Sequence, residues 1–154
     1  MAVFSFRKVG AVVAPDTGTV TFLSALAATT RALRIQELSA SGLGTASAAN
    51  EFQCAPGNAG TGALTNIAPF PINPLSTLAA GFTAGTTYAT AIPTVNAQAG
   101  IAFGVNANGG TYRWLAKTNF ELFAQQAIAG YQSINWKVVS GVSTIAGHML
   151  IEEL

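Results

Sequence analysis

The chain has 154 residues and a net charge of +1, and half of its residues are apolar. Only 8% are Asp, Glu, Lys or Arg, against about 25% in ordinary soluble domains. The near-neutral charge argues against nucleic acid as a partner, and the apolar and aromatic content argues against disorder. Gly, Pro, Asn and Thr interrupt every apolar stretch, including the charge-free residues 52–112, so we expect no membrane-spanning helix.

The low charge predicts that part of the surface is covered by another molecule. Interface interiors are depleted of charge, and an uncharged surface is prone to association. The alternative is a monomer on whose surface Ser, Thr, Asn and Gln replace charged residues. A chain of this length can bury enough surface to fold as one domain over residues 1–154. Cys54 is the only cysteine, which excludes an intrachain disulfide.

Alternating apolar and polar residues in the first third of the chain predict short β-strands. The expected strands cover residues 3–8, 18–24, 31–40 and 50–55. Residues 1–10 are expected to be either an edge strand of the sheet or an arm that reaches a neighbouring molecule. The Gly- and Asn-rich residues 56–65 are expected to form a hairpin or an exposed loop.

The middle of the chain carries the one helix signal in the sequence. The Pro-rich residues 69–74 are expected to be extended, because each Pro disfavours helical backbone in the residue before it. Asn73 followed by Pro74 is typical of a helix start, and Gly81 is typical of a helix end. We therefore predict one short connecting helix near residues 74–80.

The second half again has the pattern of strands separated by turn residues. The expected strands cover residues 86–92, 100–105, 111–116, 119–124, 133–140 and 144–152. A turn is expected at residues 106–110. In the last strand, Ile145, Gly147, Met149 and Ile151 are expected on one face and His148 on the other. The whole pattern predicts an all-β fold, a two-sheet antiparallel sandwich of jelly-roll or Greek-key type.

The sequence is poor in groups that could carry catalysis. His148 is the only histidine and Asp16 the only aspartate, so a Ser-His-Asp triad would need both, and Asp16 lies in a predicted turn. Metal sites of the kind found in jelly-roll enzymes need several histidines. No positive charge lies beside Cys54 to activate its thiol. We expect no enzymatic activity, no catalytic residue, no metal and no cofactor.

The aromatic residues of the segment 111–115 are the remaining candidates for a site. Tyr112 and Trp114 are expected on one face of a strand and Arg113 on the other. Tyr, Trp and Arg are enriched in interface anchors, so these three are predicted interface or stacking residues. Arg113 needs an acidic partner, and Glu121 is the nearest one in sequence.

Four segments together resemble small bacteriophage capsid decoration, or cement, proteins. They are Arg34 to Gly42 (RIQELSASG), Asn73 to Ala80 (NPLSTLAA), Thr111 to Leu115 (TYRWL) and Thr144 to Leu154 (TIAGHMLIEEL). The resemblance implies a β-sandwich bound to the exterior of an icosahedral capsid, often as a dimer or trimer, without catalytic residues or cofactors. The implied partners are the major capsid protein and copies of the chain itself, with no nucleic acid and no membrane. The implied location is the virion, after synthesis in the host cytoplasm.

The alternative function is a phage tail or fibre module that recognises host-surface glycans. Aromatic side chains stack on sugar rings, and the candidates for such a surface are Tyr112, Trp114, Tyr131 and Trp136.

Overall fold

The computed structural model describes residues 2–11, 16, 18–73, 78–96, 100–117, 122–141 and 143–154. These residues form twelve β-strands: β1 (Ala2–Ala11), β2 (Val20–Leu26), β3 (Ala32–Leu43), β4 (Ala49–Gly57), β5 (Leu64–Ile67), β6 (Phe70–Pro71), β7 (Thr83–Tyr88), β8 (Ile101–Asn106), β9 (Asn108–Leu115), β10 (Phe123–Gln125), β11 (Ser133–Ser140) and β12 (Thr144–Glu153). None of the described residues is helical. The predicted all-β class and its antiparallel sheets are confirmed.

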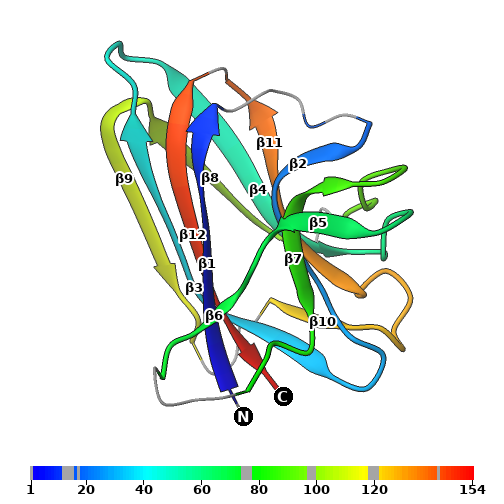
Figure 1. The fold of residues 1–154 in the computed structure, drawn as a ribbon. Coiled ribbons are helices and arrows are strands. Elements are labelled where there is room, and N and C mark those ends of the chain that lie inside the picture. The colour runs from blue at the N-terminus through cyan, green and yellow to red at the C-terminus, as the bar shows by residue number, and fades with distance from the viewer. Residues whose placement is uncertain are drawn as a thin grey trace.

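The first sheet, sheet A, has the strand order β10-β3-β12-β1-β6, and β9 also pairs with β3. Its centre is β12, which runs antiparallel to β1 from the pair Ala2↔Glu153 to the pair Ala11↔Thr144. β3 lies on the other side of β12 and continues the sheet to β9, as Figure 1 shows. β6 pairs with β1 only at Phe4 and Ser5, so the outer edge of β1 beyond Ser5 has no partner strand among the described residues.

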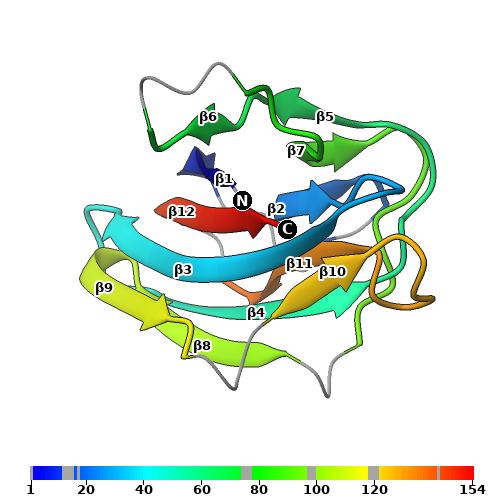
Figure 2. The ribbon, with the colours of Figure 1, turned by 90° about the horizontal axis from the view of Figure 1, so that it is seen from below.

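The second sheet, sheet B, has the strand order β5-β7-β2-β11-β4-β8. All of its pairings are antiparallel. Figure 2 looks along the sandwich from the end where the two termini lie, and it shows β3 and β12 of sheet A above β4 and β8 of sheet B. The chain passes between the sheets repeatedly, for example from β1 to β2 and from β3 to β4.

The core lies between the two sheets and is rich in aromatic rings. Sheet B contributes Trp136, whose ring centroid lies 5.1 Å from that of Phe22 and 5.8 Å from that of Phe52. Sheet A contributes aliphatic residues and two buried rings, Phe4 and Phe6. A dense apolar layer of this kind supplies the main favourable free energy of folding.

The alternation along β12 confirms the predicted faces of the last strand. Ile145, Gly147, Met149 and Ile151 are buried, whereas His148 on the opposite face is only partly buried. Gly147 lies against sheet B: a methyl group there would overlap the Phe22 ring and come within 3.2 Å of Trp136.

The predicted helix near residues 74–80 is not seen. Pro74–Thr77 lie outside the described residues, and Leu78, Ala79 and Ala80 carry no regular secondary structure. The helix signal was purely local, and local propensity is a weak determinant that tertiary contacts override. Here Gly81, the expected helix end, donates its backbone N–H to the buried carboxylate of Glu153.

Two predicted strands also shift along the chain. The strand expected at 86–92 is β7, Thr83–Tyr88, and after it Ala91 forms only an isolated bridge with Thr61, which precedes β5 in the chain. A side chain at position 85 would collide with the backbone of Thr65, so β7 has glycine there. Because glycine is unusual inside a strand, the sequence did not indicate a strand at these residues. The strand expected at 119–124 is β10, Phe123–Gln125, and residues 118–121 lie outside the described part.

Candidate functional site

The predicted aromatic pair lies on β9, where it faces the other sheet. The ring of Tyr112 stacks on the ring of Phe103 from β8, with centroids 4.0 Å apart and an interplanar angle of 5°. Phe103 in turn contacts Phe52 and Trp136 in the core. One face of Tyr112 is therefore covered from within the molecule, and this ring joins the two sheets at their β8–β9 side.

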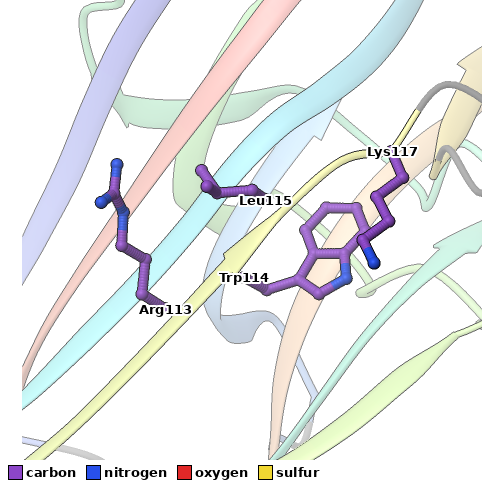
Figure 3. Close-up of a pocket in the computed structure, with 4 residues that line it drawn as sticks. All are labelled: Arg113, Trp114, Leu115 and Lys117. Carbon is purple, nitrogen blue, oxygen red and sulfur yellow. The ribbon is translucent and has the colours of Figure 1, made fainter.

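Trp114 is partly buried and packs against the same core. A surface hollow of about 540 Å³ lies at this strand and is lined by Arg113, Trp114, Leu115 and Lys117. Figure 3 shows Arg113 and Leu115 pointing away on one side of β9, while the indole of Trp114 points to the other side with Lys117 beside it. The structure thus separates the predicted residues: Tyr112 and Trp114 face inward, and Arg113 faces outward.

Arg113 pairs with Glu37 of β3 in a two-pronged arrangement. Its Nε and one terminal nitrogen donate hydrogen bonds of 2.9 Å to the two carboxylate oxygens of Glu37. These bonds lower the pKa of Glu37 below its ordinary value. The partner expected from sequence, Glu121, lies outside the described residues, and the pairing with Glu37 joins strands 76 residues apart.

The single histidine lies on the outer face of sheet A and contacts two serines. His148 Nε2 is 2.8 Å from the hydroxyl of Ser5 on β1, and Nδ1 is 3.5 Å from the hydroxyl of Ser39 on β3. Arg7 is its cross-strand neighbour on β1. Partial burial lowers the pKa of His148 below its ordinary value; the nearby Glu37 carboxylate opposes this shift and Arg7 adds to it.

The contact between Ser5 and His148 has the distance of a nucleophile–base pair, but its surroundings differ from those of a triad. The second ring nitrogen faces a serine hydroxyl, where a triad needs a carboxylate. Asp16 is used elsewhere: it accepts hydrogen bonds from the Thr21 hydroxyl at 2.9 Å and from the Phe22 backbone N–H at 3.1 Å. The Asp16 carboxylate therefore holds the turn that precedes β2.

Other side chains that could carry chemistry are also engaged in the fold. Cys54 is fully buried, and burial raises the pKa of its thiol far above the ordinary value. Glu152 and Glu153 lie on opposite faces of β12, as adjacent strand residues must: Glu152 pairs with Arg34, and Glu153 lies 3.7 Å from Arg31. Within the described ranges, no three His, Cys, Asp or Glu side chains gather closely enough to hold a metal ion.

A set of exposed apolar side chains in β6 and in the connection from β6 to β7 was not predicted from the sequence. We call Phe70, Ile72 and Leu78 the β6–β7 apolar segment; they are 68%, 53% and 60% exposed. Phe70 belongs to β6, at the edge of sheet A beside β1. The available signal was the Pro-punctuated apolar run 69–74 in the middle of the charge-free stretch.

Comparisons with protein-family models, with curated proteins and with solved structures give no match to this chain. Among the described residues, no helix has the length and apolar character needed to cross a lipid bilayer.

Proposed function

We propose that the protein is a non-enzymatic capsid decoration protein, which stabilises a phage shell by bridging neighbouring capsid subunits. The observation that carries this proposal is the β6–β7 apolar segment, whose three large side chains are more than half exposed. All three lie in the stretch of residues 52–112, which contains no Asp, Glu, Lys or Arg. Large apolar side chains exposed in a charge-poor part of the sequence are typical of surfaces that a partner covers.

The order of the strands is consistent with such a role. We propose that β1-β12-β3-β9 of sheet A and β2-β11-β4-β8 of sheet B are the two four-stranded halves of a jelly roll. Successive strands of these eight alternate between the halves, except β4 and β8, which are neighbours in sheet B; two nested Greek keys of that fold give this order. Jelly rolls are common among viral capsid domains, although a fold alone does not determine function.

The mechanism is burial of apolar surface at many equivalent contacts. A single protein interface of standard size buries about 1,600 Å², and its strength depends on a few anchor side chains. In this account Phe70 is the principal anchor. When one copy touches two capsid subunits, even weak contacts add up, because the second contact forms at a high effective concentration.

The proposal is tested by the thermal stability of shells. Shells of the phage that encodes this chain, prepared without it, are heated with and without the added protein. We expect the protein to raise the melting temperature of the shell and Phe70→Ser to abolish that rise. Val139→Ser removes a half-exposed apolar side chain from sheet B and is the matched control, which should leave the rise intact. Equal melting temperatures with and without the wild-type protein would contradict the proposal.

A second candidate function is glycan recognition by a tail or fibre module, favoured by the hollow beside Trp114 and Lys117. A glycan array separates the two functions. Binding to defined glycans that is lost in Trp114→Phe and Lys117→Ala, both still folded, would favour the glycan module over the shell protein.

A further inference from the structure

We propose that the hollow around His148 on the outer face of sheet A is a binding site for a carboxylate of a partner protein. The hollow has a volume of about 250 Å³ and is lined by Arg7, Val9, Ser39, Ser41, Ala146, Gly147 and His148. Three neighbouring strands supply these residues: β1, β12 and β3. The site contains none of the residues of the β6–β7 apolar segment, and it combines hydrogen-bond donors with the exposed side chain of Val9.

The register of sheet A brings the donors together. Arg7 of β1 is paired with His148 of β12, and His148 is paired with Ser39 of β3. These residues therefore form one row across the outer face, where directly opposed side chains lie about 4.5–5.5 Å apart. Ser41 occupies the next row on the same face of β3.

Within the described part of the chain, the charges of the row leave one positive charge without a counter-ion. Glu37 and Arg113, which flank the row from β3 and β9, neutralise each other through their hydrogen-bonded pair. Arg7 has no ion pair with any described residue, and the Ser41 hydroxyl has no hydrogen-bond partner among them. A guanidinium group binds a carboxylate through two parallel hydrogen bonds, and serine hydroxyls can complete the coordination.

The single unpaired charge favours a monoanion. A carboxylate bound at Arg7 makes the row neutral, whereas a phosphate dianion would leave an excess of negative charge beside Glu37.

His148 makes the binding depend on pH. The groups that face it are Ser5 and Arg7 from β1, and Glu37 and Ser39 from β3; protonation of the imidazole adds a second positive charge that attracts the carboxylate.

The open edge of β1 favours a protein as the source of the carboxylate. β6 covers this edge only at Phe4 and Ser5, so the backbone next to Arg7 and Val9 is unpaired by any described strand. An extended segment of another protein can add to such an edge and present alternate side chains to one face. Its acidic side chain would then lie beside Arg7. That this partner is a capsid subunit rests on the proposed function; the carboxylate site itself does not.

The test uses NMR spectroscopy on the isotope-labelled full chain with small probes. N-acetyl-glutamate N-methylamide is titrated at about pH 6, and the ring signals of His148 and the backbone signals of Arg7 and Ser41 are followed. We expect saturable shifts with a dissociation constant of about 1–30 mM, the range for one charge-assisted contact. We also expect bound probe to raise the pKa of His148, because the carboxylate favours the imidazolium.

Matched probes and variants give the result its meaning. The glutamine analogue of the probe should bind at least about tenfold more weakly, and Arg7→Gln should weaken binding of the acidic probe by a similar factor. Lys117→Gln removes the same charge outside the hollow and should leave binding unchanged. His148→Asn should remove the pH dependence of binding while keeping the contribution of Arg7.

Three results would overturn the inference. The first is no saturable shift at His148, and the second is equal binding of the glutamate and glutamine probes. The third is tighter binding of the methyl glycoside of N-acetylneuraminic acid, which would assign the site to a sugar acid instead of a protein. Each leaves the shell-melting test unaffected, so failure of this site and failure of the proposed function are distinguishable.

Discussion

Gly147 lies at a close approach of the two sheets, because β12 passes directly over Phe22 and Trp136 of sheet B. A strand interior normally gains from a side chain, so glycine at the centre of a ten-residue strand needs a reason. The reason here is space. The aromatic rings of sheet B occupy the volume that a side chain at this position would fill.

We expect Gly147→Ala to lower the free energy of unfolding by about 1–3 kcal/mol, the usual cost of overpacking a core. The matched control is Gly104→Ala on β8, where the nearest atom to an added methyl group would be 3.7 Å away. That variant should stay within about 0.5 kcal/mol of the wild type. Urea unfolding curves of the three proteins measure the difference. Equal stabilities of the two variants would show that the sheets are not packed as closely at Gly147 as described.

His148 gives the protein a second prediction at the residue scale. Its pKa in the folded protein lies below the ordinary value of 6.5, so below that pH the unfolded chain takes up a proton more readily than the folded one. Stability must therefore fall as the pH drops from about 7.5 towards 5.5 and must be fully present above that window. His148→Asn should flatten this part of the stability profile, since no other histidine is present. An unchanged slope in the variant would contradict the assignment.

At the scale of elements, the strands that alternate clearly in sequence are those predicted well. β12 and β9 place their residues on alternating faces as expected, because successive side chains of a strand point to opposite faces. The failures have identifiable physical causes. The Asn73-Pro74 signal is local and carries no information about the contact between Gly81 and Glu153. The position of β7 was predicted wrongly because Gly85, which weakens the strand pattern, is needed where the backbone of Thr65 leaves no room for a side chain.

The candidate site was predicted only in part, for a related reason. Tyr112, Arg113 and Trp114 were identified from one strand, and their alternation gave the correct faces. Pairing partners come from other strands, however, and a register between distant segments is not readable from one sequence. Arg113 therefore pairs with Glu37 of β3 and not with the expected Glu121. For the same reason, the row of Arg7, His148 and Ser39 was not predicted from the sequence.

The strand β9 makes a prediction that separates its two faces. Tyr112→Ala removes the ring stacked on Phe103 and should lower the free energy of unfolding by about 1–3 kcal/mol. Leu115→Ala truncates a half-exposed side chain of the same strand and should change stability by less than about 0.5 kcal/mol. Thermal or urea unfolding of both variants provides the comparison. A larger loss in Leu115→Ala than in Tyr112→Ala would reverse the assigned faces.

For the whole molecule, two surfaces stand out on a frame that has few charges. The β6–β7 apolar segment offers large apolar side chains, and the hollow around His148 offers hydroxyls and a guanidinium group that forms no ion pair with a described residue. They follow one another along the β1 edge, since β6 borders its first half and the hollow borders its second. A partner that covered this edge could use both, with apolar anchors supplying affinity and the charge supplying orientation.

We propose that this protein binds a capsid at defined positions, and the number of copies bound per shell is the measurement that bears on this most closely. Shells lacking the protein are incubated with an excess of it and washed, and the increase in shell mass is measured by mass spectrometry of the intact particles. We expect an increase that saturates at one reproducible number of copies, in simple proportion to the capsid subunits. An unchanged shell mass, or an increase that never saturates, would contradict it.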